Sequence, residues 1–314
     1  MYTVTHTVVD LLPKDAIQSI DDPLYSNSFD GDSSDEVIVV ERENTVRAYP
    51  TRILQNHEVV NETFAGKEIA ITWCPLCASA VVYDRRLDGE LLTFGVSGKL
   101  ADNDLVLYDR ETESEWKQSS GICLSGTHEG KSLTAMPAAT MTWSAFEERF
   151  PDGKVLQPPE WGTADYGTDR FAEYMHSDYV GPGGDDRLRT AIEDWPFEFH
   201  PKTLTLGITI DGESRGYPRS VVTAADGVVT DTLGGTELVV FATDAGLFAY
   251  ESKQILFEQT PDKSRFRGDG TVWDPATGRS EDGRTLTRIP NRRLFAFTWR
   301  DDNGTDAFFI SEQR

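Results

Sequence analysis

The chain is poor in cysteine, in basic residues and in long hydrophobic runs. Its 314 residues include three cysteines, an odd number too small for a disulfide framework, which indicates a reducing compartment. Thirty Lys and Arg against 53 Asp and Glu leave a net charge of −23, which excludes a basic surface that binds nucleic-acid phosphates. No run approaches the roughly 18 apolar residues of a membrane helix, so we expect no membrane insertion.

The amino-terminal segment also lacks a basic start, a long apolar core and a small-residue cleavage site, which are the parts of a secretory signal. These absences predict a soluble, cytoplasmic protein. Because high ionic strength screens repulsion between like charges, we interpret the acidic surface as halophilic, an adaptation to a salty cytoplasm. Most of its carboxylates are expected to be a solvated coat and not cation sites.

The chain, which has 38% hydrophobic and 11% aromatic residues, contains an internal repeat. Ala48-Tyr49-Pro50 recurs as Gly216-Tyr217-Pro218, and similar landmarks follow each motif in the same order. We therefore predict two tandem copies of one β module. Residues 1–156 form the first copy, 157–200 a connection rich in Gly, Pro, Asp and Tyr, and 201–314 a second copy without cysteines.

Short β-rich runs separated by turn residues predict a mainly β fold with a few short helices, a β-rich α+β class. Asp88-Gly89 indicates a hairpin, and helices are expected after Pro50 and over residues 143–150. The Gly95–Gly98 segment, which contains Ser97 and precedes Asp104, predicts a turn.

A pair of cysteines distinguishes the first copy from the second. Cys74 and Cys77 match Thr243 and Gly246, and His57 matches Asp226. Since the second copy does without both thiols, the fold does not require them, and they become candidates for chemistry added to the scaffold. A Trp-Cys-x-x-Cys motif is also found in thioredoxin, where it begins a helix, but here residues 78–83 have a strand pattern, so we reject that fold.

Three functions remain open for this pair. In a thiol oxidoreductase, one cysteine attacks as a thiolate, the other resolves the intermediate, and His57 or Arg85 lowers the pKa of the attacking thiol; the substrate would be a small molecule or a thiol or disulfide. In a metal-binding protein, Cys74, Cys77 and His57 hold zinc, iron or copper. In a non-catalytic binding or scaffold module, the cysteines are small buried hydrophobes. No other cofactor is implied.

The motifs Trp73-Cys74-Pro75-Leu76-Cys77, Phe94-Gly95-Val96-Ser97-Gly98 and Tyr108-Asp109-Arg110-Glu111-Thr112 resemble the family called domain of unknown function 3179, and the resemblance covers nearly the whole chain. Relatives described as (seleno)proteins imply that a cysteine position can carry selenium, which favours a redox function. The resemblance gives Cys123 no role. Besides the catalytic candidates Cys74, Cys77 and His57, we assign supporting roles to Glu58, Asp84, Arg85, Ser97, Asp104, Asp109 and Arg110.

Overall fold

The computed structural model describes residues 6–182, 190–192 and 194–310. Within these ranges the chain is mainly β, as the alternation of β-rich runs and turns predicts. The described helices are all short: α1 (Thr51–Leu54), α2 (Trp143–Arg149), α3 (Ala172–Met175), α4 (Arg219–Ala224) and α5 (Ala296–Asn303). None of them is long and apolar enough to cross a membrane.

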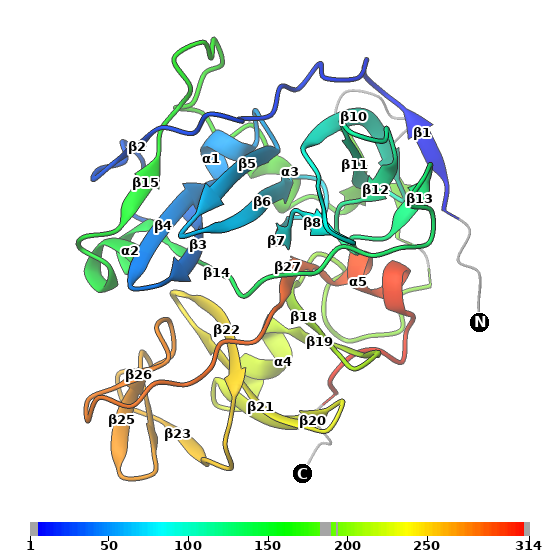
Figure 1. Ribbon diagram of the computed structural model, residues 1–314. Helices are drawn as coiled ribbons and strands as arrows, with labels where there is room; N and C mark the ends of the chain where they lie inside the picture. Colours follow the sequence, from blue (N-terminus) through cyan, green and yellow to red (C-terminus); the bar gives the residue numbers. More distant parts are fainter. Residues whose placement is uncertain (1–5, 183–189, 193, 311–314) are drawn as a thin grey trace.

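Two large sheets form the centre of the molecule (Figure 1). The eight-stranded sheet has the order β2 (Tyr25–Ser26), β15 (Lys154–Leu156), β4 (Thr45–Pro50), β3 (Glu36–Arg42), β14 (Ala139–Thr142), β22 (Gly246–Glu251), β21 (Thr236–Thr243) and β20 (Val228–Leu233). The six-stranded sheet has the order β19 (Glu213–Pro218), β18 (Leu204–Ile210), β27 (Arg292–Phe295), β7 (Ser79–Asp84), β6 (Lys67–Cys74) and β5 (Val59–Phe64).

Each large sheet combines strands from both halves of the chain. In the eight-stranded sheet, β14 pairs with β3 of its own half and with β22 of the other. In the six-stranded sheet, β27 pairs with β18 of its own half and with β7 of the other. In Figure 1 both strands lie between the two halves. The two halves are therefore joined by backbone pairing in both large sheets. One hydrophobic cluster contains residues of both halves, and another lies wholly in the second half.

Corresponding side chains form similar networks in the two halves. In the first, Tyr49 and Arg47 both bond to the carboxylate of Glu62. In the second, Tyr217 and Arg215 donate to Oδ2 of Asp231 at 2.7 and 2.5 Å. We propose that these networks reflect the tandem repeat, whose boundaries at residues 156 and 201 stay a prediction.

The remaining strands form smaller sheets. The five-stranded sheet consists of β1 (Val8–Asp10), β10 (Phe94–Ala101), β11 (Asp104–Asp109), β12 (Glu115–Lys117) and β13 (Cys123–Ser125). The four-stranded sheet consists of β23 (Phe257–Gln259), β24 (Phe266–Gly268), β25 (Thr271–Asp274) and β26 (Arg279–Ser280). Two hairpins complete the fold: β8 (Arg86–Leu87) with β9 (Glu90–Leu91), and β16 (Tyr179–Val180) with β17 (Thr190–Ala191).

Several local predictions are confirmed by these elements. Pro50 is the N-cap of α1, and Asp88-Gly89 connects β8 to β9. Helix α2 begins after Thr142, whose Oγ1 accepts a hydrogen bond from the Ala145 amide at 3.3 Å. The turn expected over Gly95–Gly98 is wrong, because this segment lies inside β10. A register shift there, between Val96 and Lys99, is an irregularity of the strand and not its end.

The largest hydrophobic core lies where the six-stranded sheet meets the five-stranded sheet. It contains Trp73 of β6, Trp116 of β12 and Phe295 of β27, all at most 3% exposed. Cys74 and Cys77 belong to the same core. The structure therefore places the cysteine pair inside the protein, at the junction of two sheets.

Candidate functional site

The two cysteines lie on a tight β hairpin. Strand β6 ends at Cys74, strand β7 begins at Ser79, and these two residues pair directly. The motif thus leads into a strand, which confirms that it differs from the helix-starting motif of thioredoxin. In the second half Thr243 pairs directly with Gly246, so Gly246 corresponds to Ser79. The match between Cys77 and Gly246 is wrong, because Cys77 lies in a turn that is two residues longer.

Two distant segments, α3 and β27, hold the carbonyl groups of this turn. The Tyr174 hydroxyl donates to the carbonyl of Leu76 at 2.6 Å, and the Phe295 amide donates to the carbonyl of Cys77 at 2.8 Å. The Arg293 guanidinium donates to the carbonyl of Ala78 at 2.9 Å, where the backbone φ is +47°. The conformation of the turn is therefore fixed by tertiary contacts as well as by its own sequence.

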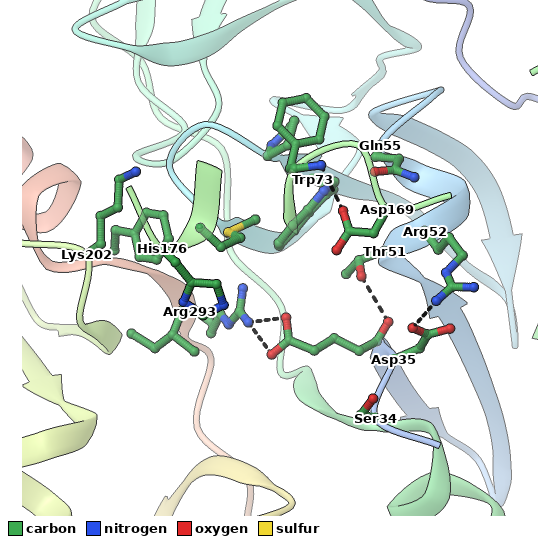
Figure 2. A pocket seen from close by; sticks show the side chains of 16 residues that line it. Ser34, Asp35, Thr51, Arg52, Gln55, Trp73, Asp169, His176, Lys202 and Arg293 are labelled. Carbon is green, nitrogen blue, oxygen red and sulfur yellow. Dashed lines mark hydrogen bonds and ion pairs between the residues drawn. The ribbon is translucent and has the colours of Figure 1, made fainter. Parts of the chain in front are cut away.

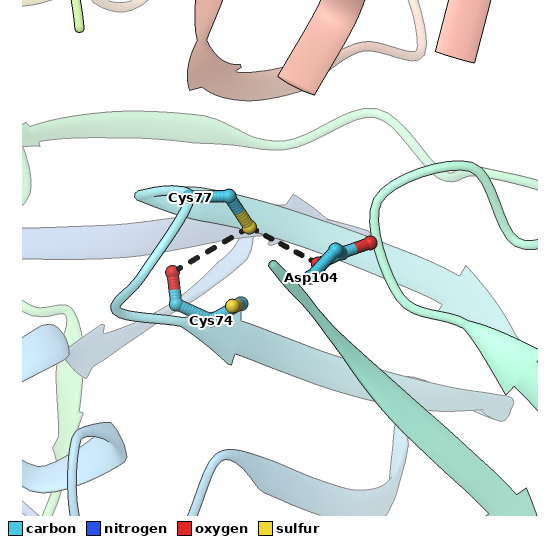
Figure 3. Close-up of side chains that lie close together, drawn as sticks. All are labelled: Cys74, Cys77 and Asp104. Atoms are coloured by element: carbon cyan, nitrogen blue, oxygen red, sulfur yellow. Dashed lines mark hydrogen bonds between the residues drawn. The ribbon is translucent and has the colours of Figure 1, made fainter. Parts of the chain in front are cut away.

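A carboxylate completes the site. Asp104, the first residue of β11, accepts a hydrogen bond from the Cys77 thiol at 3.0 Å (Figure 3). Ligand atoms of Cys74, Cys77 and Asp104 lie within 4.8 Å of one another, and the three residues are at most 1% exposed. No other group of three such residues in the described part of the chain meets this distance. Two sulfurs and an oxygen thus converge in a site closed to bulk water.

Burial controls the protonation of this cluster. It raises the pKa of the Cys77 thiol well above its ordinary value, and the neighbouring Cys74 and Asp104 raise it further. It also raises the pKa of Asp104, against the opposing effect of the Lys117 ammonium. The hydrogen bond from thiol to carboxylate is consistent with a protonated Cys77. An unassisted nucleophilic thiolate is therefore disfavoured at Cys77.

The ammonium group of Lys117 connects the cluster to the other half of the chain. Lys117 is fully buried, and its Nζ lies 2.7 Å from Oδ1 of Asp302 in α5 and 3.2 Å from Oδ2 of Asp102. Burial alone would lower the pKa of Lys117, but the charges of Asp302 and Asp104 raise it above its usual value. Ser119 also links Asp104 to Asp302, because its amide donates to Asp104 at 2.8 Å and its hydroxyl donates to Asp302 at 2.6 Å.

A second buried carboxyl group lies in the field of Asp104. Burial and the charge of Asp104 raise the pKa of Glu58 from 4.5 to about 8. Its Oε2 has no hydrogen-bond partner among the described residues, and the same holds for Oγ of Ser79, opposite Cys74 in the hairpin. Buried polar atoms of native proteins normally find a partner in the protein, in water or in a bound ion.

His57 does not join the cluster. One ring nitrogen of His57 lies 2.8 Å from the carbonyl of Gln18, and the other lies 2.7 Å from the hydroxyl of Tyr166. Its ring stacks on Tyr166 and meets Trp161 edge-on, and burial lowers its pKa. One ring nitrogen thus contacts the amino-terminal segment and the other the segment between the halves. The structure brings Asp104 instead of His57 to the sulfur atoms.

The other supporting residues make structural contacts with neighbouring strands and loops. Arg85 donates to the carbonyl of Leu92 at 2.6 Å and to Thr93, so its guanidinium fixes a loop and makes no hydrogen bond to either thiol. The remaining contacts pair Asp84 with Lys67, Ser97 with the Val106 carbonyl, Asp109 with Thr112 and the Trp116 indole, and Arg110 with Asp15. The third cysteine, Cys123, is buried with its thiol 3.3 Å from the carbonyl of Ser125.

From the sequence, Asp104 and Glu58 are predicted only as supporting residues, and Lys117, Ser119 and Asp302 are not predicted. Ser119 and Asp302 are 183 positions apart, so no spacing rule connects them. The one local sequence signal for Lys117 is its position directly after the core residue Trp116, because a charge in a buried strand needs a partner.

Comparison with known proteins assigns the chain to a family. No curated protein and no solved structure matches the chain. The family model described as protein of unknown function (DUF3179) matches residues 14–307, a range that includes the cysteine hairpin, Asp104 and both halves of the two large sheets. The chain therefore belongs to the DUF3179 family.

Proposed function

We propose that Cys74, Cys77 and Asp104 bind one divalent metal ion of the zinc class. The observation that carries this proposal is the convergence of three buried ligand atoms within 4.8 Å. Thiolate sulfur and carboxylate oxygen are both common zinc ligands. The donor set differs from the one expected from sequence, which uses His57 as third ligand, because both ring nitrogens of His57 are engaged elsewhere.

The size of the cluster supports this function. Zinc bonds of about 2.3 Å to sulfur and about 2.0 Å to oxygen in a tetrahedron separate the ligand atoms by roughly 3.5–3.8 Å. The hydrogen bond of 3.0 Å between Cys77 and Asp104 lies just below this spacing. Loss of the thiol proton and a movement of a few tenths of an ångström would therefore create room for the ion.

The charge of the site also favours a cation. Cys74, Cys77, Asp104 and Glu58 are four acidic groups in one buried region, and Lys117 is the ammonium group whose charge acts on Asp104. A divalent ion would stabilise the deprotonated ligands, and the unpartnered Oε2 of Glu58 is available as an acceptor for a water bound to the ion. Because the site is closed, we assign the ion a structural role.

Elemental analysis of protein purified without an affinity tag tests this proposal. We expect about one zinc ion per chain, lost in the Cys74→Ser and Asp104→Asn variants because each removes a ligand. A chelator should lower the melting temperature of the unmodified protein, since an ion that binds the folded state stabilises it.

Cys123→Ser is the matched control, because it removes a buried cysteine outside the cluster and should keep the metal. The proposal is wrong if the purified protein contains no stoichiometric transition metal and added zinc leaves the melting temperature unchanged.

A thiol redox function is the second candidate, favoured by two sulfur atoms within disulfide-forming reach on one hairpin. In this reaction Cys74 and Cys77 lose two electrons and two protons and form a disulfide, while a small oxidant such as hydrogen peroxide is reduced to water. The cysteines are 1% and 0% exposed, so a protein disulfide cannot reach them without opening of the hairpin. A small-molecule substrate is therefore required.

Alkylation after unfolding separates the two candidates. If the pair is redox-active, metal-free protein treated with hydrogen peroxide forms a Cys74–Cys77 disulfide and leaves only Cys123 to react with iodoacetamide. Zinc should suppress this oxidation if the same sulfurs are its ligands. Three alkylated cysteines after peroxide treatment would contradict the redox function and leave the metal proposal intact.

A further inference from the structure

A cavity lies beside the cysteine hairpin, separate from the sulfur cluster. Its volume is about 440 Å³, within the range of small-molecule sites, and neither cysteine nor Asp104 lines it. Its walls come from the first half, the connection and the second half, as Figure 2 shows. The apolar part of the lining consists of Trp73, Pro75, Phe171, Met175, Leu204 and Phe295.

Two of the three Lys and Arg side chains that line the cavity are already neutralised. Arg52 forms an ion pair with Asp35 at 2.6 Å and a second with Asp32 at 3.2 Å. Arg293 pairs with the carboxylate of Glu36. Figure 2 shows the guanidinium group of Arg52 directed at Asp35. Neither group has an uncompensated charge to offer a ligand.

Lys202 differs from these two arginines in its partners. It is 7% exposed, and its ammonium group donates to the carbonyl of Tyr174 at 2.6 Å and to the hydroxyl of Ser177 at 2.8 Å. No carboxylate among the described residues lies within the 4.0 Å of an ion pair, and Asp178, whose charge acts on it from further away, has a fully exposed side chain. An ammonium group has three N–H donors, so one remains without an acceptor in the described part of the chain.

The surroundings of this ammonium group make the unpaired charge costly. Its Nζ lies 3.5 Å from the centre of the Tyr174 ring, a contact that stabilises a cation but does not neutralise it. Burial lowers the pKa of Lys202 to about 8, which reflects the missing solvation of the charge. An anionic group at this end of the cavity would restore an ion pair.

We propose that this cavity binds a small organic carboxylate, with the carboxylate at Lys202 and the apolar body between Trp73 and Phe295. The apolar walls favour a ligand with a hydrocarbon or aromatic body over a fully hydrated inorganic anion. The net charge of −23 opposes any anion at low salt, so selection must come from the local charge of Lys202, and salt weakens the opposing field.

Calorimetric titration with 3-phenylpropionate, 3-phenylpropan-1-ol and inorganic phosphate, all at one salt concentration, tests the proposal. We expect the carboxylate to bind at least about tenfold more tightly than the alcohol, and phosphate to bind more weakly than both. Lys202→Gln should abolish the preference for the carboxylate and leave the affinity for the alcohol unchanged. Equal binding of carboxylate and alcohol to the unmodified protein, or no binding of either at about 10 mM, would overturn it.

Two further variants control for folding. Lys202→Arg keeps a cation and should retain most of the preference, even if the hydrogen bonds to Tyr174 and Ser177 change. Lys131→Gln removes an exposed lysine that does not line the cavity and should leave both affinities unchanged. If Lys202→Gln is folded by its melting curve and still prefers the carboxylate, Lys202 is not the anion site. The titration tests Lys202 separately from the metal proposal, because neither cysteine nor Asp104 lines the cavity.

Discussion

Replacement of Lys117 by methionine is expected to destabilise the protein by about 3–5 kcal/mol, the range for breaking a buried ion pair. Lys117 is fully buried, and its ammonium group lies 2.7 Å from Asp302 and 3.2 Å from Asp102. Asp302 is itself 6% exposed, so the substitution leaves a buried carboxylate without its cation. The loss should appear as a lower denaturation midpoint in urea with an unchanged slope.

A double variant shows whether the lost ion pair causes the destabilisation. Lys117→Met with Asp302→Asn removes both charges, so its free energy of unfolding should exceed that of Lys117→Met alone. Lys131→Met is the matched control: Lys131 and Asp88 form an exposed pair at 2.8 Å, and its loss should cost less than about 1 kcal/mol. A Lys117→Met variant as stable as this control would refute the importance of the buried pair.

The Glu58→Gln substitution is expected to stabilise the metal-free protein progressively as the pH rises. Because the pKa of Glu58 rises from 4.5 to about 8 on folding, the folded state keeps a proton that the unfolded state has already released. The unmodified protein therefore loses stability between about pH 4.5 and pH 8, by at most about 1.4 kcal/mol per pH unit from this group, and the loss ends above pH 8. Glutamine does not ionise and lacks this dependence.

Urea titrations of both proteins with a chelator present, at several pH values from 5 to about 9, measure the effect. The difference in unfolding free energy should grow by a few kcal/mol over this range in favour of the variant. Glu258→Gln, which removes one exposed charge from β23, controls for the change in net charge. A constant difference between Glu58→Gln and the unmodified protein across this range would contradict a buried, proton-bound Glu58.

Bound zinc should remove this pH-dependent loss of stability if Glu58 helps to bind the metal. A bound dication favours the deprotonated carboxyl group, so the unmodified protein with zinc should no longer lose stability in this pH window. Comparison of the two proteins with and without zinc thus connects the proton-bound state of Glu58 to the proposed metal site.

Local sequence signals predicted the elements that depend on neighbouring residues. Pro50 marks the start of α1, Asp88-Gly89 forms its hairpin, and the strand after Cys77 excludes the thioredoxin arrangement. Alternation and turn chemistry act over a few residues, so one strand or one turn can be recognised by itself. The expected turn at Gly95–Gly98 fails, because glycines also occur at irregularities within a strand, where pairing with β11 decides.

The composition of the site could not be predicted in the same way. The thiols and their close spacing are visible in the sequence, but the choice of Asp104 over His57 as their neighbour depends on how the five-stranded sheet packs on the cysteine hairpin. Likewise, no local pattern reveals that β14 and β27 cross between the halves, because pairing between distant strands is decided by the packing of whole sheets.

By itself the sequence determined an acidic, mainly β protein with one cysteine pair on a strand-forming segment, since charge, periodicity and spacing are properties of adjacent residues. Only the tertiary structure decided that this pair is buried against a carboxylate and that Lys117 connects this region to Asp302. It also decided that Lys202 has no acid at close range among the residues that the structure describes. Solvation and Coulomb energies depend on distances in space, and folding brings together groups that lie more than a hundred residues apart.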